Sequence, residues 1–80
     1  MKREIVTFNG SSTHAGQIKR WILEGGEPPT GDGIHTMDIR PFTIEVDDTL
    51  YTVNPSEKIC KVSQTVLGAT YFLIGYKDEE

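Results

Sequence analysis

The sequence predicts a single α+β domain, in which an antiparallel sheet of four to five strands has one helix packed on one face. Runs rich in β-branched and aromatic residues recur along the chain, one stretch has the apolar spacing of an amphipathic helix, and turn residues separate these segments. The 80 residues are expected to form one domain, residues 1–80. The expected order is one strand, the helix, and then three or four strands.

The first strand is expected over residues 3–8, because residues 4–8 (EIVTF) are β-branched and aromatic. Asn9-Gly10 ends it, since both residues tolerate positive φ. Residues 11–13 offer side-chain oxygens to the free N–H groups of a helix start, and the helix is expected over about 13–24. Gly25-Gly26 ends the helix. Its apolar stripe consists of Ala15, Ile18, Trp21 and Ile22.

Residues 42–53 give the strongest hairpin signal, with Asp47-Asp48 at the tip. In that register Val46 faces Thr49, Ile44 faces Tyr51 and Phe42 faces Val53, so all six lie on one sheet face. Further strands are expected over 34–39 and 70–76. Residues 58–66 fit a strand or a short helix, because the apolar residues Ile59, Val62 and Val66 also follow helical spacing.

The predicted core combines the helix stripe with the inward residues of the strands. Its members are Ile5 or Val6, Phe8, Ile18, Trp21, Ile22, Ile44, Tyr51, Val53, Val62, Leu73 and Ile74. Trp21 is expected to anchor this core rather than to bind a ligand, because it shares a stripe with Ile18 and Ile22.

No motif predicts a reaction. His14 and His35 lack the paired spacing of a metal site, and a surface or helix-cap role is expected for them. Cys60 is the only cysteine and is expected to be a half-buried structural thiol. Residues 30–33 are rich in glycine but lack the Lys-Ser/Thr of a phosphate loop. The sequence therefore predicts no catalytic residue, no metal ligand and no cofactor.

The charge is uneven along the chain. Residues 1–40 hold five basic and five acidic groups, so the whole net charge of −4 lies in residues 41–80. An acidic domain is not expected to bind nucleic acid directly, because domains that grip phosphates are usually basic. An acidic surface suits a basic groove on a protein or ribonucleoprotein complex. The expected partner-binding residues are the loop 27–33 and the carboxylates Glu45, Asp47, Asp48, Glu57, Asp78, Glu79 and Glu80.

The pattern of Ile18, Trp21-Ile22 and Gly25-Gly26, followed by the hairpin runs 43–46 and 53–55 and by residues 69–71, resembles short phage and prophage open reading frames. The resemblance covers about residues 18–71 but not the segment 56–68 within them. As a compact, acidic, single-domain chain without catalytic motifs, the protein is similar to the small inhibitors that phages make against host defence, including anti-CRISPR proteins. Those proteins share no common fold, so the resemblance assigns no functional residue.

These observations predict a non-enzymatic binding or inhibitor protein that blocks a host macromolecular complex, with a CRISPR effector as the candidate target. The alternative is a small homodimeric structural or assembly protein, because an 80-residue domain without disulfides or metal has little to stabilise it. The third hypothesis is a small ligand-binding domain or enzyme. The single cysteine and the lack of an apolar signal segment or of a membrane-spanning run predict the cytoplasm of a bacterial host.

Overall fold

The computed structural model describes residues 2–35, 37–64 and 69–76. It has one helix and antiparallel strands, which confirms the predicted α+β class. The strands form two sheets, one three-stranded in the order β1-β4-β5 and one two-stranded, where the sequence predicted a single sheet. The elements are β1 (Lys2–Thr7), α1 (Ser12–Glu24), β2 (Phe42–Val46), β3 (Thr49–Val53), β4 (Lys58–Gln64) and β5 (Ala69–Tyr76).

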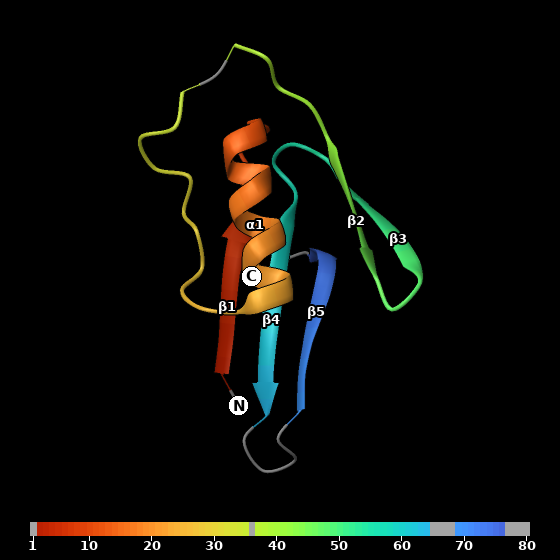
Figure 1. The fold of residues 1–80 in the computed structure, drawn as a ribbon. Helices are drawn as coiled ribbons and strands as arrows, with labels where there is room; N and C mark the ends of the chain where they lie inside the picture. The colour runs from red at the N-terminus through yellow and green to blue at the C-terminus, as the bar shows by residue number, and fades with distance from the viewer. Residues whose placement is uncertain (1, 36, 65–68, 77–80) are drawn as a thin grey trace.

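Strand β4 is the centre of the larger sheet. Its Ile59 pairs with Val6 of β1 on one side and with Ile74 of β5 on the other. Pairing on both sides uses the backbone N–H and C=O groups of residues 58–64, which form a strand and not the alternative short helix. Residues 65 and 66 of the predicted segment lie outside the described residues. Figure 1 shows α1 lying across one face of this sheet, and the β2–β3 hairpin lying beside β5.

Both ends of α1 are capped by residues that suit those positions. The Ser11 side chain accepts a hydrogen bond from the His14 backbone N–H at 2.9 Å, which satisfies one of the free donors of the first turn. At the other end, Gly25 has a φ of 86° and its N–H donates to the Trp21 carbonyl at 3.0 Å. The predicted helix is therefore confirmed, and it begins one residue earlier than expected.

The β2–β3 hairpin has the predicted register, with Phe42 opposite Val53 and Ile44 opposite Tyr51. Asp47 and Asp48 form its two-residue turn with φ values of 51° and 64°. Positive φ at both central residues is typical of a type I′ turn, in which Asn, Asp and Gly are favoured. The hairpin packs its inner face on α1 and contacts β5 without joining the larger sheet.

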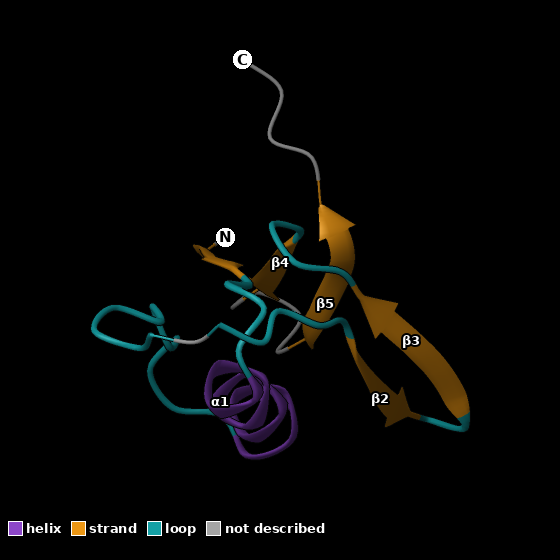
Figure 2. Ribbon diagram, turned by 90° about the horizontal axis from the view of Figure 1, so that it is seen from above, coloured by secondary structure: helices purple, strands orange, loops and turns teal. Residues whose placement is uncertain are grey.

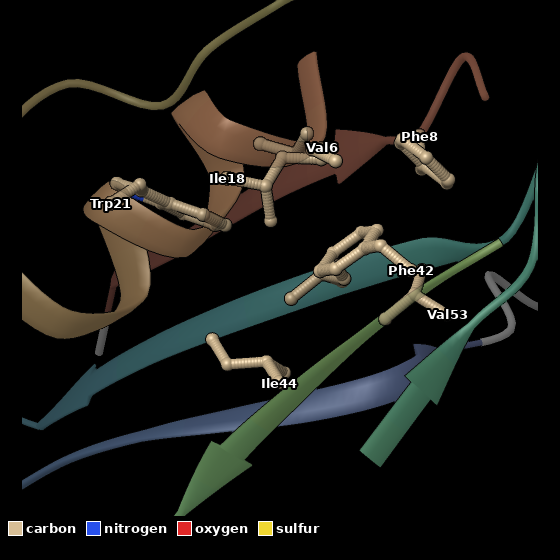
Figure 3. Close-up of a cluster of buried hydrophobic side chains, with 9 residues drawn as sticks. Val6, Phe8, Ile18, Trp21, Phe42, Ile44 and Val53 are labelled. Carbon is tan, nitrogen blue, oxygen red and sulfur yellow. The ribbon is translucent and has the colours of Figure 1, made fainter. Parts of the chain in front are cut away.

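The core lies where the helix, the sheet and the hairpin meet, as Figure 3 shows. Phe8 and Phe42 meet edge to face with ring centroids 4.8 Å apart, and Trp21 meets Phe72 in the same way at 5.3 Å. Edge-to-face pairs of this kind contribute about 0.5–1.5 kcal/mol beyond the area that they bury. The structure thus confirms Trp21 as a core anchor.

Three residues of the predicted core are exposed. Ile5 and Leu73 are about 42 % exposed because strand alternation places them on the sheet face that α1 does not cover, so Val6 is the core residue of β1. Tyr51 is 37 % exposed because it lines an open cleft between the hairpin, α1 and β5. Val62 is buried as predicted, but on the face opposite α1.

The strand predicted over 34–39 is wrong, because the described residues of this segment form no strand. Met37 and Ile39 are exposed, and neither belongs to the core cluster. The segment runs from one side of α1 to β2 and is joined to the start of the helix by the bond from the Arg40 N–H to the Gly10 carbonyl at 3.0 Å. Apolar composition alone does not form a strand without a partner for its backbone groups.

Candidate partner-binding site

Three of the predicted carboxylates lie together at the tip of the β2–β3 hairpin. Asp47 and Asp48 form the turn, and Glu45 lies two residues before Asp47 on β2, on the outer face of the hairpin. All three side chains are exposed, and none forms an ion pair with another described residue. The turn has a defined backbone conformation, with both aspartates at positive φ.

Glu57 does not belong to this group. It follows β3 at the opposite end from the turn, and five strand residues separate the two ends by about 17 Å. Its carboxylate already accepts a hydrogen bond from the Asn54 backbone N–H at 2.7 Å. Asp78, Glu79 and Glu80 lie outside the described residues. The loop 27–33 lies on the other side of α1 from the hairpin, as Figure 1 shows, so it is not continuous with the tip either.

A cleft of about 320 Å³ lies beside the tip, between the hairpin, α1 and β5. Its walls are mostly apolar: Ile22 comes from α1, Val46 and Tyr51 from the hairpin, and Phe72 from β5. Asp47 also lines it, so a carboxylate lies at the border of an apolar hollow. Sequence reasoning missed this cleft, although the predicted register already placed Val46 and Tyr51 on one face of the hairpin.

The pairing of a carboxylate with an apolar cleft suits a lysine or arginine side chain. Such a side chain has a long apolar stem that packs on hydrophobic surface while its charged end stays near water. Here the stem would pack between Val46 and Tyr51, and the charged end would pair with Asp47. The ring of Tyr51, which lines the cleft, also attracts cations through its face.

The two histidines and the cysteine lie in three different parts of the fold. The His14 ring, predicted at the surface or as part of a cap, is fully buried. Its Nδ1 accepts from the Asn9 backbone N–H at 3.2 Å, and its Nε2–H donates to the Pro29 carbonyl at 3.1 Å. Cys60 is fully buried on the sheet face opposite α1, and His35 is exposed in the long loop.

The described residues contain no group of three or more His, Cys, Asp or Glu side chains that could hold a metal ion. In the same part of the chain, no helix has both the length and the hydrophobicity that crossing a membrane requires. Comparison with protein-family models, with curated proteins and with solved structures gives no match. The resemblance to phage inhibitors therefore stays a prediction.

Proposed function

We propose that the protein is a non-enzymatic binding protein that engages a basic surface of a partner macromolecule through the hairpin tip and its cleft. The observation that carries this proposal is the position of Asp47, which belongs to the exposed acidic turn and also lines the apolar cleft. A basic side chain of the partner would gain an ion pair and apolar contact at one place. The neighbouring Asp48 and Glu45 would extend the attraction over the rest of a basic groove.

The target class is the basic groove that a nucleic-acid-binding complex presents, and a CRISPR effector in the cytoplasm of a bacterial host is the candidate. Opposite charges raise the association rate and orient the encounter of two proteins. An inhibitor of this kind needs no chemistry of its own, because it occupies the groove in place of the nucleic acid. Glu45, Asp47 and Asp48 are the proposed contact residues among those described.

The test is a binding titration of purified CRISPR effector complexes, in which the double substitution Asp47→Asn and Asp48→Asn is compared with the wild type. Asparagine tolerates positive φ as well as aspartate does, so the turn is retained while two charges are removed. The matched control, Glu27→Gln with Asp32→Asn, removes two exposed charges from the loop 27–33, which the sequence predicted as a contact but which lies on the other side of α1 and is not part of the proposed site.

We expect an effector that binds the wild type and the control equally and the tip variant about tenfold or more weakly, which corresponds to roughly 1.4 kcal/mol. The fold of the variants is checked by circular dichroism. Equal affinity of all three proteins, or no binding of the wild type to any of the purified effector complexes, contradicts the proposal.

A further inference from the structure

Strand β5 forms one edge of the three-stranded sheet. It pairs with β4 without interruption over residues 69–74, and no hydrogen bond between described residues joins it to the β2–β3 hairpin. Figure 2 shows β4 on one side of β5 and the hairpin on the other. In an antiparallel pair every second residue directs its N–H and C=O away from the partner strand. These groups of β5 therefore point away from β4 and toward the side on which the hairpin lies.

The cleft beside the hairpin tip reaches this edge of β5. Thr70, Tyr71 and Phe72 all line it, although successive residues of a strand point to opposite faces of the sheet. A hollow that touches three successive residues lies along the edge of the strand and not only over one face. A molecule in the cleft would therefore meet the free backbone groups of β5.

The composition of β5 leaves this edge unprotected. Residues 69–76 (ATYFLIGY) include no charged residue and no proline, and residues 70–75 are all exposed or half-buried. Edge strands are commonly protected from further pairing by charged side chains or proline. The opposite edge strand, β1, begins with the charged residues Lys2, Arg3 and Glu4. The β5 edge is therefore the one that suits an added strand, which is how many domains bind extended peptides.

The walls of the cleft indicate which side chains such a strand would carry. Ile22, Val46, Phe72 and Ile74 line the cleft, and each is only partly buried against the core. Residues paired across two strands share a face, so every second side chain of an added strand would point toward this apolar margin. Asp47 lines the same cleft and is exposed. A segment with apolar and basic residues at alternate positions complements both features.

We infer that the free edge of β5 binds an extended segment of the partner as an added strand, with a basic side chain of that segment paired with Asp47. This inference rests on the proposed function, because it states how the partner binds at the same site. The backbone hydrogen bonds to β5 supply affinity, and the side chains in the cleft supply specificity. The basic residue and the apolar residues that flank it are two positions apart in the partner segment.

The first test uses the peptide Thr-Val-Thr-Lys-Thr-Val-Thr with blocked termini, whose Val, Lys and Val side chains share one face. Hydrogen exchange of the backbone amides is followed by NMR with and without about 2 mM peptide, since we expect a dissociation constant of roughly 0.1–1 mM for so short a segment. We expect slower exchange at every second amide over residues 69–74, the amides that β4 leaves unpaired, and no change in β1.

A matched pair of variants tests the role of Asp47. Asp47→Asn and Asp48→Asn each remove one exposed charge from the turn, and asparagine tolerates the positive φ of both positions. Only Asp47 lines the cleft. We therefore expect Asp47→Asn to weaken peptide binding about threefold more than Asp48→Asn does. The same peptide with Glu in place of Lys should bind the wild type more weakly for the same reason.

The second test repeats the exchange measurement with a bound effector complex, which should protect the same amides. An effector that needs the hairpin tip but leaves β5 unprotected overturns this inference and not the proposed function. Protection by the peptide without binding to any effector supports the inference and contradicts the proposed function. The inference also fails if about 2 mM peptide protects no β5 amide, or if the two aspartate substitutions act equally. Protection that develops when the protein alone is concentrated would assign the edge to a second copy of the chain, and this also overturns the inference.

Discussion

His14 and Pro29 are joined by a hydrogen bond from the imidazole Nε2–H to the Pro29 carbonyl at 3.1 Å, although 15 residues separate them. The other ring nitrogen, Nδ1, accepts from the Asn9 backbone N–H at 3.2 Å. A carbonyl can only accept and an amide N–H can only donate, so the two partners require the neutral ring with its proton on Nε2. One buried side chain thereby fastens the long loop to the start of α1.

Replacing His14 by alanine should lower the free energy of unfolding by about 2–4 kcal/mol, because two hydrogen bonds are lost and two partly buried backbone groups are left without these partners. Urea denaturation measures this change. His35→Ala, at an exposed position, is the control and should cost less than about 0.5 kcal/mol. His14→Asn keeps an acceptor near the Asn9 N–H and should recover part of the loss. Equal stability of the two alanine variants would refute the role of His14.

Gly31 and Gly33 form a natural matched pair in the same loop, with φ values of 78° and 79°. A Cβ on Gly31 would lie 2.9 Å from the His14 ring, whereas a Cβ on Gly33 would meet nothing within 4 Å. Gly33→Ala should therefore lower the free energy of unfolding by about 1 kcal/mol, which is the cost of a side chain at positive φ. Gly31→Ala should lower it by about 1–2 kcal/mol more, because its Cβ also meets the His14 ring. Thermal denaturation of the two variants compares them directly, and equal melting temperatures would rule out the close packing of Gly31 on His14.

The hairpin turn should become more stable when Asp47 and Asp48 are replaced by Asn and Gly. Both residues have positive φ, and Asn-Gly is the preferred pair for such a turn. The expected gain in the free energy of unfolding is about 0.5–1 kcal/mol, since glycine has no steric cost at positive φ. The double alanine substitution should lower it by about 1–2 kcal/mol. Chemical denaturation that gives the opposite order would show that the turn has another conformation.

Trp21 combines strong apolar burial with an unpaired polar atom. The side chain is 1 % exposed, and its Nε1–H has no hydrogen-bond partner among the described residues. Trp21→Phe removes this unpaired donor along with part of the ring, so it should lower the free energy of unfolding by about 1–2 kcal/mol. Trp21→Ala should lower it by about 3–5 kcal/mol. Equilibrium unfolding followed by circular dichroism gives both values. A cost of Trp21→Phe as large as that of Trp21→Ala would indicate that the Nε1–H is paired.

The local parts of the fold could be predicted from the sequence. The hairpin register follows from alternation around Asp47-Asp48, because paired residues share a face and the turn residues fix where the pairing begins. Ser11 and Gly25 mark the ends of α1 for equally local reasons. Three acidic residues at one tip then lie close together in any fold that contains this hairpin.

The non-local parts could not be predicted in the same way. The pairing of Val6 with Ile59 joins residues far apart in the chain. A register shift of one residue in β1 would place Ile5 in the core in place of Val6. The buried position of His14 depends on the backbone of Asn9 and Pro29, which no side-chain pattern reveals. The cleft beside Asp47 requires β5 to lie next to the hairpin, which is a tertiary contact.

The salt dependence of effector binding tests the central claim most directly. Affinity is measured at several salt concentrations for the wild type, for the Asp47→Asn/Asp48→Asn variant and for the Glu27→Gln/Asp32→Asn control. Salt screens attraction between exposed charges, so the wild type and the control should lose affinity in parallel as salt increases, and the tip variant should change little. Three parallel curves would contradict the claim that the hairpin tip binds a basic surface.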